Sequence, residues 1–284
     1  MNNMLIRALT GVLYIALLVG GMLGGSITFA LLVAAIAALS VWEFTGLINR
    51  HVGASVNQLI ATACSLAFVF ALWQCCTLAP SYQFFLPFVG TVLYLLISEL
   101  YRRESNPLKN WAYSFAAQLY IALPLAMLSF LAYRYDVKMQ DVRYDWLLPL
   151  SIFFFLWSSD SGAYLVGSTL SRYFPAKLFP RISPGKSWVG SIGGGVLTLV
   201  VAAVLWHFRP ELLNLPQWLG LGLVVCVFGT WGDLVESLFK RQLGIKDSGQ
   251  LLPGHGGILD RFDSALLAIP AAVIYLSFIA PYLN

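Results

Sequence analysis

The sequence predicts an all-α polytopic membrane protein with about nine transmembrane helices. Apolar residues make up 59% of the 284 positions and charged residues only 11%, whereas soluble domains carry about 25% charged residues. A spanning helix needs about 20 mostly apolar residues, and nine runs of that kind stand between charged or turn-forming breaks. They lie at residues 8–24, 27–48, 57–78, 82–100, 111–133, 146–167, 188–208, 216–235 and 263–282.

The first run is interpreted as a retained helix rather than a cleaved signal peptide. It has no small-x-small cleavage site followed by a polar region, and only Gly24, Gly25 and Ser26 separate it from the second run. The four cysteines all lie inside predicted spans without a C-x-x-C pair. Neither a disulfide framework nor a zinc site is therefore expected.

The chain is predicted to be one integral membrane domain with two unequal halves. Residues 1–135 are interpreted as a helical scaffold, because their spans consist mainly of Leu, Ala, Val, Ile and Phe. Acidic residues occur there only near the span ends, at Glu43, Glu99 and Glu104. Residues 146–284 are interpreted as the catalytic half, because polar residues gather at the ends of these spans.

The lysine and arginine distribution predicts a cytoplasmic N-terminus and a C-terminus on the other side. In this N-in/C-out orientation, 13 of the 17 cations lie on the cytoplasmic side, as the positive-inside rule requires. The other side receives Arg134, Lys138, Arg143 and Arg209. The cations face lipid headgroups or phosphates, and no nucleic-acid partner is expected, because no long basic tail occurs. A multi-pass protein of the bacterial cytoplasmic (inner) membrane, with its site facing the cytoplasm, fits a chain without an organellar presequence.

Asp160 is a candidate binding residue. It lies in an otherwise apolar run beside Ser158, Ser159 and Ser161. An ionisable group at membrane depth costs about 2.5–3.5 kcal/mol on an insertion scale, and such groups usually line a site or a water-filled cavity. The alternative is a shallow aspartate that is hydrogen-bonded to its serines.

The segment of residues 171–195 combines four cations with prolines and glycines. The prolines exclude a long helix, and the glycines allow backbone N–H groups to approach an anion at the start of the next span. The ordered sequence ISPGKSW, which contains Ser183 and Lys186, favours a phosphate-binding loop over a simple topology signal.

The eighth span continues into GTWGDLVESLFKRQ, residues 229–242. If the helix persists, Asp233, Ser237, Lys240 and Arg241 share one face at i, i+4, i+7 and i+8. They would then project a carboxylate, a hydroxyl and two cations toward one place at the membrane surface. Interfacial snorkelling of the two cations is the alternative interpretation.

Residues 246–264 are the least apolar stretch of the chain. Mg²⁺ usually takes one or two carboxylates together with substrate phosphates and waters. The candidate metal ligands are Asp233, Asp247, Asp260 and Asp263. The cations that could meet the charge of a polyphosphate are Lys240, Arg241, Lys246 and Arg261. This combination suggests metal-assisted phosphoryl or nucleotidyl transfer at a membrane surface.

Four residues of this stretch have further or open roles. His255 could donate to a phosphate or a leaving group, or could merely tie the loop together. Gly256 and Gly257 permit turns that would strain other residues and count as substrate-binding candidates. Asp263 is equally well explained as the N-cap of the last span.

The run from Ser237 to Asp263, SLFKRQLGIKDSGQLLPGHGGILDRFD, resembles the signature of the phosphatidate cytidylyltransferases, also called CDP-diacylglycerol synthases. That signature has the form S-x-hydrophobic-K-R, four residues, K-D, then P-x-H-G-G-hydrophobic-x-D-R-hydrophobic-D, and this sequence matches it without a gap. DSGAY (160–164) and RISPGKSW (181–188) are also similar to family segments. Many members continue I-S-P-x-K with Thr-x-Glu-Gly, whereas this chain has no carboxylate at Val189.

The resemblance implies transfer of CMP from CTP to phosphatidic acid, giving CDP-diacylglycerol and pyrophosphate, with Mg²⁺ required and a second cation left open. It implies that Asp233 and Asp260 bind the metal, with Asp247 and Asp263 as further ligands or orienters. The implied charge-neutralising or catalytic residues are Lys186, Lys240, Arg241, His255 and Arg261. The implied substrate-binding residues are Asp160, Ser183, Lys186, Ser237, Lys246, Gly256 and Gly257.

Two other functions stay open. A CTP-dependent kinase of long-chain alcohols such as dolichol or phytol would use a similar metal and CTP site but would transfer the γ-phosphate; the long signature run argues against it. A transporter would place ionisable residues in several spans near the midplane and show repeated halves, whereas these charges collect at one face. Homodimerisation through the apolar N-terminal half is also open.

Overall fold

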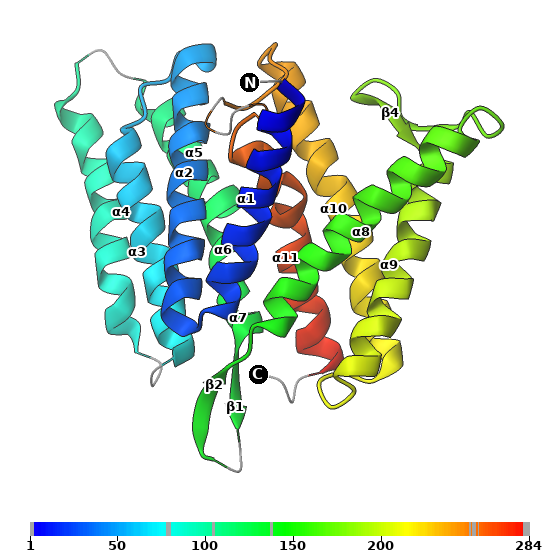
Figure 1. The fold of residues 1–284 in the computed structure, drawn as a ribbon. Coiled ribbons are helices and arrows are strands. Elements are labelled where there is room, and N and C mark those ends of the chain that lie inside the picture. The colour runs from blue at the N-terminus through cyan, green and yellow to red at the C-terminus, as the bar shows by residue number, and fades with distance from the viewer. Residues whose placement is uncertain are drawn as a thin grey trace. The chain divides into compact units, whose positions relative to one another are not determined.

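The computed structural model describes residues 3–77, 81–103, 106–136, 139–249, 251, 254 and 256–280. They form mainly helices, with two short β-hairpins (Figure 1). The chain divides into two compact units: unit 1 comprises Met1–Trp146 and Leu243–Phe262, and unit 2 comprises Leu147–Gln242 and Asp263–Asn284. The sequence groups residues 243–262 with the second half, but their contacts belong to the unit that contains the N-terminal scaffold.

Unit 1 consists of helices in sequential contact. These are α1 (Asn3–Leu23), α2 (Ser26–Val52), α3 (Gln58–Thr77), α4 (Leu86–Ser98), α5 (Pro107–Ala117), α6 (Leu123–Ala126) and α7 (Leu128–Ala132). The 3₁₀ turns η1 (Tyr82–Phe85) and η2 (Glu99–Tyr101) flank α4, and the π-helical turn η3 (Gln118–Ala122) joins α5 to α6. Helix α2 packs on α1 and α3, and α3 packs on α4, so each apolar run buries part of its surface against a neighbour.

A hairpin of β1 (Tyr133–Asp136) and β2 (Asp141–Tyr144) follows α7. Trp73 Nε1 donates to the phenolic oxygen of Tyr133 at 2.6 Å, and Ser26 Oγ lies 2.6 Å from the same oxygen. The Tyr133 and Tyr144 rings are in contact. Burial raises the pKa of the Tyr133 phenol, which therefore stays neutral and can both donate and accept. These contacts fasten the base of the hairpin to α2 and α3.

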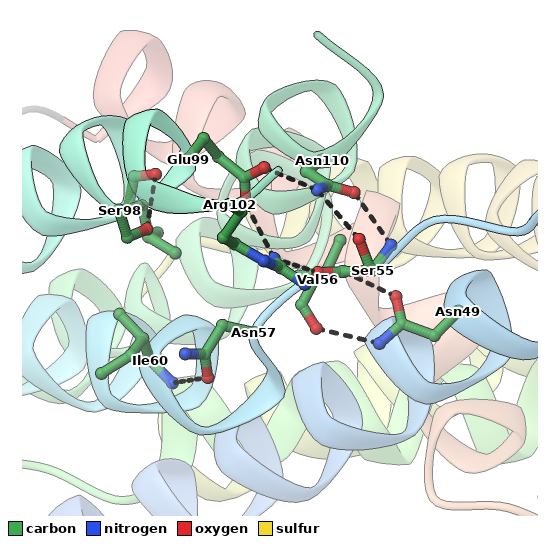
Figure 2. A network of polar contacts seen from close by, with 10 residues as sticks. Asn49, Ser55, Val56, Asn57, Ile60, Ser98, Glu99, Arg102 and Asn110 are labelled. Atoms are coloured by element: carbon green, nitrogen blue, oxygen red, sulfur yellow. Dashed lines mark hydrogen bonds and ion pairs between the residues drawn. The ribbon is translucent and has the colours of Figure 1, made fainter. Parts of the chain in front are cut away.

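A buried carboxylate joins two connections of unit 1 (Figure 2). The Glu99 side chain accepts from Arg102 Nη1 at 2.8 Å and from Asn110 Nδ2 at 2.9 Å. Asn110 Oδ1 in turn accepts from the backbone N–H of Ser55 at 2.9 Å. A buried charge is tolerated where it is paired and hydrogen-bonded. The scaffold therefore contains a structural carboxylate that links the α2–α3 connection to η2 and α5.

Unit 2 is organised around two closely packed helices. Its elements are α8 (Leu147–Leu170), β3 (Lys177–Phe179), β4 (Ser183–Ser187), α9 (Trp188–Phe208), α10 (Leu215–Gln242) and most of α11 (Leu259–Ile279), whose first four residues belong to unit 1. Strands β3 and β4 form an antiparallel hairpin, where the prolines exclude helix as predicted. Helix α9 packs along α8 and also against α10 (Figure 1).

Glycines bring α8 and α9 together. A Cβ atom at Gly193 would lie 2.4 Å from the Val166 side chain, and one at Gly194 would lie 2.6 Å from the carbonyl oxygen of Ser159. At Gly162 a Cβ would lie 2.7 Å from the carbonyl oxygen of Gly193. The structure uses Gly193 and Gly194 for close helix packing, because no side chain fits there. The interpretation that glycines at the start of this span approach an anion stays a prediction, and Gly185 and Gly190 line a cavity.

Replacing Gly194 with alanine is expected to lower the free energy of unfolding by about 1–3 kcal/mol, because the new methyl group overpacks the α8–α9 contact. Gly195→Ala is the matched control, since a Cβ there meets no atom within 4 Å and alanine favours helix by about 0.8–1 kcal/mol. Thermal unfolding in detergent, followed by circular dichroism, measures both variants. Equal midpoints for the two would contradict the packing role.

Seven helical segments within the described residues are long and apolar enough to cross a membrane. They correspond to the predicted spans except the first and the sixth. The apolar part of α1, Ala8–Leu23, is shorter than the others, and Asp160 with its neighbouring serines reduces the hydropathy of α8. The fold class of a mostly helical membrane protein is confirmed, and the count of nine spans stays a prediction.

Candidate active site

Unit 2 contains a polar cavity of about 460 Å³. Its walls come from α8, the β3–β4 hairpin, the start of α9, and Thr230 of α10. Its charged lining residues are Asp160, Lys177 and Lys186. Its serines are Ser159, Ser168, Ser171, Ser187 and Ser191. The volume falls in the range of about 300–1,000 Å³ that is typical of small-molecule sites, and the lining suits an anionic ligand.

Asp160 lies on α8 at this cavity, with an exposed side chain. The neighbouring serines engage other groups: Ser158 Oγ donates to the carbonyl oxygen of Phe155 at 2.9 Å, and Ser159 Oγ lies 3.2 Å from Cys226 Sγ. The structure thus places Asp160 where an ionisable residue in an apolar run is expected, at a polar cavity. Its role in substrate binding stays a prediction.

Lys186 connects the cavity to Asp233. Strand β4 positions Lys186 so that its Nζ lies 2.5 Å from Asp233 Oδ2 and donates to the carbonyl oxygen of Thr230 at 3.4 Å. Asp233 Oδ1 accepts from Ser237 Oγ, one turn later on α10, at 3.2 Å. The structure therefore brings three predicted site residues together: the Asp233 carboxylate contacts the Lys186 ammonium through one oxygen and the Ser237 hydroxyl through the other.

Ser187 fixes the hairpin to the helix that follows it. It is the N-cap of α9, where its Oγ accepts from the backbone N–H of Gly190 at 3.2 Å. The same oxygen lies 2.9 Å from Ser171 Oγ at the end of α8. An N-cap serine satisfies an otherwise unpaired N–H of the first turn. The fixed position of Ser187 also restricts the position of Lys186, the residue before it. Ser183 is the first residue of β4 and pairs with Phe179 of β3.

Helix α10 extends to Gln242, beyond the predicted span, and carries a second ion pair. Lys240 pairs with Glu236, whose side chain is fully buried. Sequence reasoning assigns Lys240 to substrate charge and does not single out Glu236. The structure gives Lys240 a structural partner at i, i+4, while Arg241 is exposed.

Asp263 lies in the second turn of α11, half-buried. The interpretation of Asp263 as an N-cap is wrong, because α11 begins four residues earlier, at Leu259. Its Oδ1 accepts from the backbone N–H of Ser264 at 2.5 Å. Asp263 also interacts electrostatically with Asp233 and Lys240, so unit 2 holds two interacting carboxylates beside cationic groups.

Asp260 lies in the first turn of α11, within unit 1. Its Oδ2 accepts from the backbone N–H groups of Ser248 at 2.9 Å and Gly257 at 2.8 Å. Gly256 has φ 83°, and a Cβ there would lie 2.6 Å from Asp260 Oδ2. Both predicted substrate-binding glycines therefore contact the Asp260 carboxylate, Gly257 through its backbone N–H and Gly256 at a position where a side chain would collide with it.

The remaining predicted site residues are exposed or lie outside the described part of the chain. Lys246, Asp247 and Arg261 are exposed. His255 lies outside the described residues.

Asp233 and Asp263 are two carboxylates of unit 2 that interact with each other. Among the residues that the structure describes, no group of three or more His, Cys, Asp or Glu side chains is placed to hold a metal ion. Mg²⁺ does not need such a group, because one or two carboxylates suffice when substrate phosphates and waters complete its coordination. Asp233 and Asp263 interact with like charge, and a bound cation would relieve that repulsion.

Sequence reasoning missed Glu43 and Glu236 as parts of polar clusters. Glu236 pairs with Lys240, and Glu43 contacts the segment that precedes α11. The signal that singled out Asp160, an ionisable residue within an apolar helix, applies equally to Glu43 in the sequence VWEF. Glu43 lies in the half interpreted as scaffold, and its hydrogen-bond partners lie in the signature run.

The chain matches the model of the cytidylyltransferase family over residues 5–279. It is 37% identical over 171 residues to a phosphatidate cytidylyltransferase of Haemophilus influenzae, covering 59% of this chain and 57% of that protein. It is 43% identical over 142 residues to one of Staphylococcus aureus, covering 50% and 52%. A third, from Staphylococcus haemolyticus, is 46% identical over 127 residues, covering 45% and 48%. The chain thus spans about half the length of the curated relatives it matches.

Proposed function

Because this chain belongs to the cytidylyltransferase family, we propose that it transfers CMP from CTP to phosphatidic acid, giving CDP-diacylglycerol and pyrophosphate. The observation that carries the proposal is the polar cavity lined by Lys186, whose ammonium group is held 2.5 Å from Asp233. The names of the bacterial relatives support the same reaction.

The reaction requires little acid–base catalysis by the protein. An oxygen of the phosphatidic acid phosphate bonds to the α-phosphorus of CTP, while the bond from that phosphorus to the oxygen bridging the β-phosphate breaks. That oxygen leaves with the β- and γ-phosphates as pyrophosphate. Because the attacking phosphate is already an anion at neutral pH, the main tasks are to bring two anions together and to stabilise the charge of the transition state.

The cavity residues suit these tasks. Lys177 and Lys186 line it and would offset the charge of bound phosphates through charge-assisted hydrogen bonds. Serine hydroxyls would donate to phosphate oxygens or to the ribose. The further proposed substrate-binding residues are Asp160, Ser183, Ser237, Lys246, Gly256 and Gly257. The further proposed charge-neutralising or catalytic residues are Lys240, Arg241, His255 and Arg261.

Mg²⁺ is the proposed cofactor, and when bound it would neutralise phosphate charge and hold the reacting groups in register. Asp233 and Asp263 are proposed ligands, because they interact as like charges that a bound cation would offset. Asp260 and Asp247 are the further proposed ligands. Asp260 accepts hydrogen bonds from two backbone N–H groups. These bonds orient the carboxylate, and its negative charge stays available to attract a cation.

The proposal includes nine spans, a cytoplasmic N-terminus, and an active site facing the cytoplasm of a bacterium. The positive-inside distribution supports the orientation, and the bacterial relatives support the membrane. Helix α8 has 24 residues, enough to span at about 1.5 Å per residue. A homodimer built on the apolar N-terminal helices stays open within this proposal.

The proposed function is tested with the purified protein in detergent micelles containing phosphatidic acid and CTP labelled at its α-phosphate. Label is expected in the lipid fraction only when Mg²⁺ is present. CTP labelled at its γ-phosphate should release the label as pyrophosphate. In parallel micelles that contain a long-chain alcohol instead of phosphatidic acid, transfer of the γ-label and not the α-label to the alcohol would reverse the assignment in favour of an alcohol kinase.

A further inference from the structure

We propose that Glu43 of α2 is a positioning residue, which fixes the start of α11 and thereby the Asp260 carboxylate. The effect of Glu43 on catalysis rests on the proposed function, whereas the contacts of Glu43 lie inside unit 1 and do not depend on it. Glu43 lies outside the signature run and comes from the half that the sequence interprets as scaffold. Its effect on the reaction would therefore be indirect, through Asp260.

The Glu43 carboxylate receives three donors from a segment that lies 205 to 216 residues later in the chain. The Ser248 hydroxyl donates to Oε1. The backbone N–H of Ile258 donates to Oε2 at 3.0 Å, and that of Leu259 donates to Oε1 at 3.3 Å. Both oxygens of the carboxylate are thus used, and two of the three donors lie at the start of α11.

Two of these donors belong to the beginning of a helix. Helix α11 begins at Leu259, and the first N–H groups of a helix have no partner within it. A side chain from another helix therefore supplies acceptors for N–H groups at the start of α11, in addition to Asp260, which accepts from Gly257. The negative charge of Glu43 also interacts favourably with the positive end of the helix dipole.

Ser248 connects Glu43 to Asp260 through hydrogen bonds. Its hydroxyl donates to Glu43 and accepts from the backbone N–H of Asp260 at 3.3 Å. Its own backbone N–H donates to the Asp260 carboxylate at 2.9 Å. Ser248 is only 1% exposed, so it cannot readily exchange these partners for water. Glu43 and Asp260 are thus linked through one buried residue.

The backbone at Gly257 lies close to the Glu43 carboxylate. A Cβ at Gly257 would lie 1.8 Å from Glu43 Oε1 and 2.2 Å from Ser248 Oγ. At Gly249 a Cβ would lie 2.6 Å from Glu43 Oε2. The requirement for glycine at these two positions therefore comes from the Glu43 carboxylate, which is a different reason from contact with a substrate.

The decisive variant is Glu43→Gln in the full-length chain. It keeps the size of the side chain but replaces one acceptor oxygen with an NH₂ group that cannot accept from a backbone N–H. Hydrogen exchange of the amides at 256–262 is expected to accelerate on the order of tenfold, because local opening near the start of α11 becomes easier. The kcat for CDP-diacylglycerol formation should fall by a similar factor or more, with a smaller change in KM for CTP.

Glu99→Gln is the matched control, because it changes another carboxylate of unit 1, one bound to Arg102 and Asn110 (Figure 2). It should lower thermal stability without accelerating exchange selectively at 256–262. Gly257→Ala should reproduce the Glu43→Gln exchange pattern, because the new methyl group displaces the carboxylate.

The exchange measurement separates this inference from the proposed function. If the amides at 256–262 exchange at the parental rate in Glu43→Gln, the inference that Glu43 fixes the start of α11 is overturned, whatever the activity. Faster exchange with an unchanged kcat would reduce Glu43 to a structural cap and overturn the positioning role. If the parent chain made no CDP-diacylglycerol, the proposed function and the catalytic role of Glu43 would both fall, while the exchange data would still decide whether Glu43 fixes α11.

Discussion

Asp233→Asn is expected to reduce kcat for CDP-diacylglycerol formation by about 10²–10³, the range found when a preorganised electrostatic group is removed from a transition state. Asparagine keeps an oxygen that can accept from Ser237, which lies 3.2 Å from Asp233 Oδ1. It has no negative charge to attract a cation or to hold Lys186, whose Nζ is 2.5 Å from Oδ2. The reduction of kcat is measured from initial rates in mixed micelles over a range of Mg²⁺ concentrations.

Ser237→Ala is the control for the same contact. It removes the hydrogen bond to Asp233 but leaves the carboxylate charged, so the loss in transition-state stabilisation should correspond to one hydrogen bond to a charged group, about 1.5–3 kcal/mol, and stay below that of Asp233→Asn. Circular dichroism melting in detergent should show that both variants are folded. Parental rates and an unchanged Mg²⁺ dependence in Asp233→Asn would remove Asp233 from the proposed site.

The sequence predicts the helices well because lipid imposes a simple requirement on them. An apolar run must satisfy its backbone internally, so runs of sufficient length become helices, and α9 occupies 188–208 as predicted. The two hairpins carry no such signal, because their strands have only three to five residues. Their pairing depends on neighbouring contacts, such as those that bind Tyr133 to Trp73 and Ser26.

The site was predictable where its residues are local to one another. Helical spacing alone places Ser237 beside Asp233, and the structure adds Lys186 to that pair. The start of α11 was not predictable, because it depends on Glu43, which is remote in the sequence. The misinterpretation of Asp263 as an N-cap has this origin: the true cap comes from another helix.

Lys186→Gln is expected to lower kcat/KM for CTP by about tenfold to 150-fold, because a hydrogen bond to a charged group contributes about 1.5–3 kcal/mol. Lys186 is the lining cation whose ammonium is held by both Asp233 and the carbonyl oxygen of Thr230, so it is already oriented before substrate binds. Lys177→Gln is the matched control: Lys177 also lines the cavity but is exposed on β3, so its loss should have a smaller effect. Equal losses would indicate general charge attraction instead of a specific role for Lys186.

The Lys186→Gln/Asp233→Asn double variant tests whether the two residues act as one unit. Groups in direct contact give non-additive losses, so the double variant should be little worse than Asp233→Asn alone. Once Asp233 is neutral, the ion pair at 2.5 Å is lost, and only the longer contact to the carbonyl oxygen of Thr230, at 3.4 Å, still orients the Lys186 ammonium. Fully additive losses in kcat/KM would show that Lys186 and Asp233 contribute independently. The ion pair would then be a contact of the resting protein with no part in the transfer.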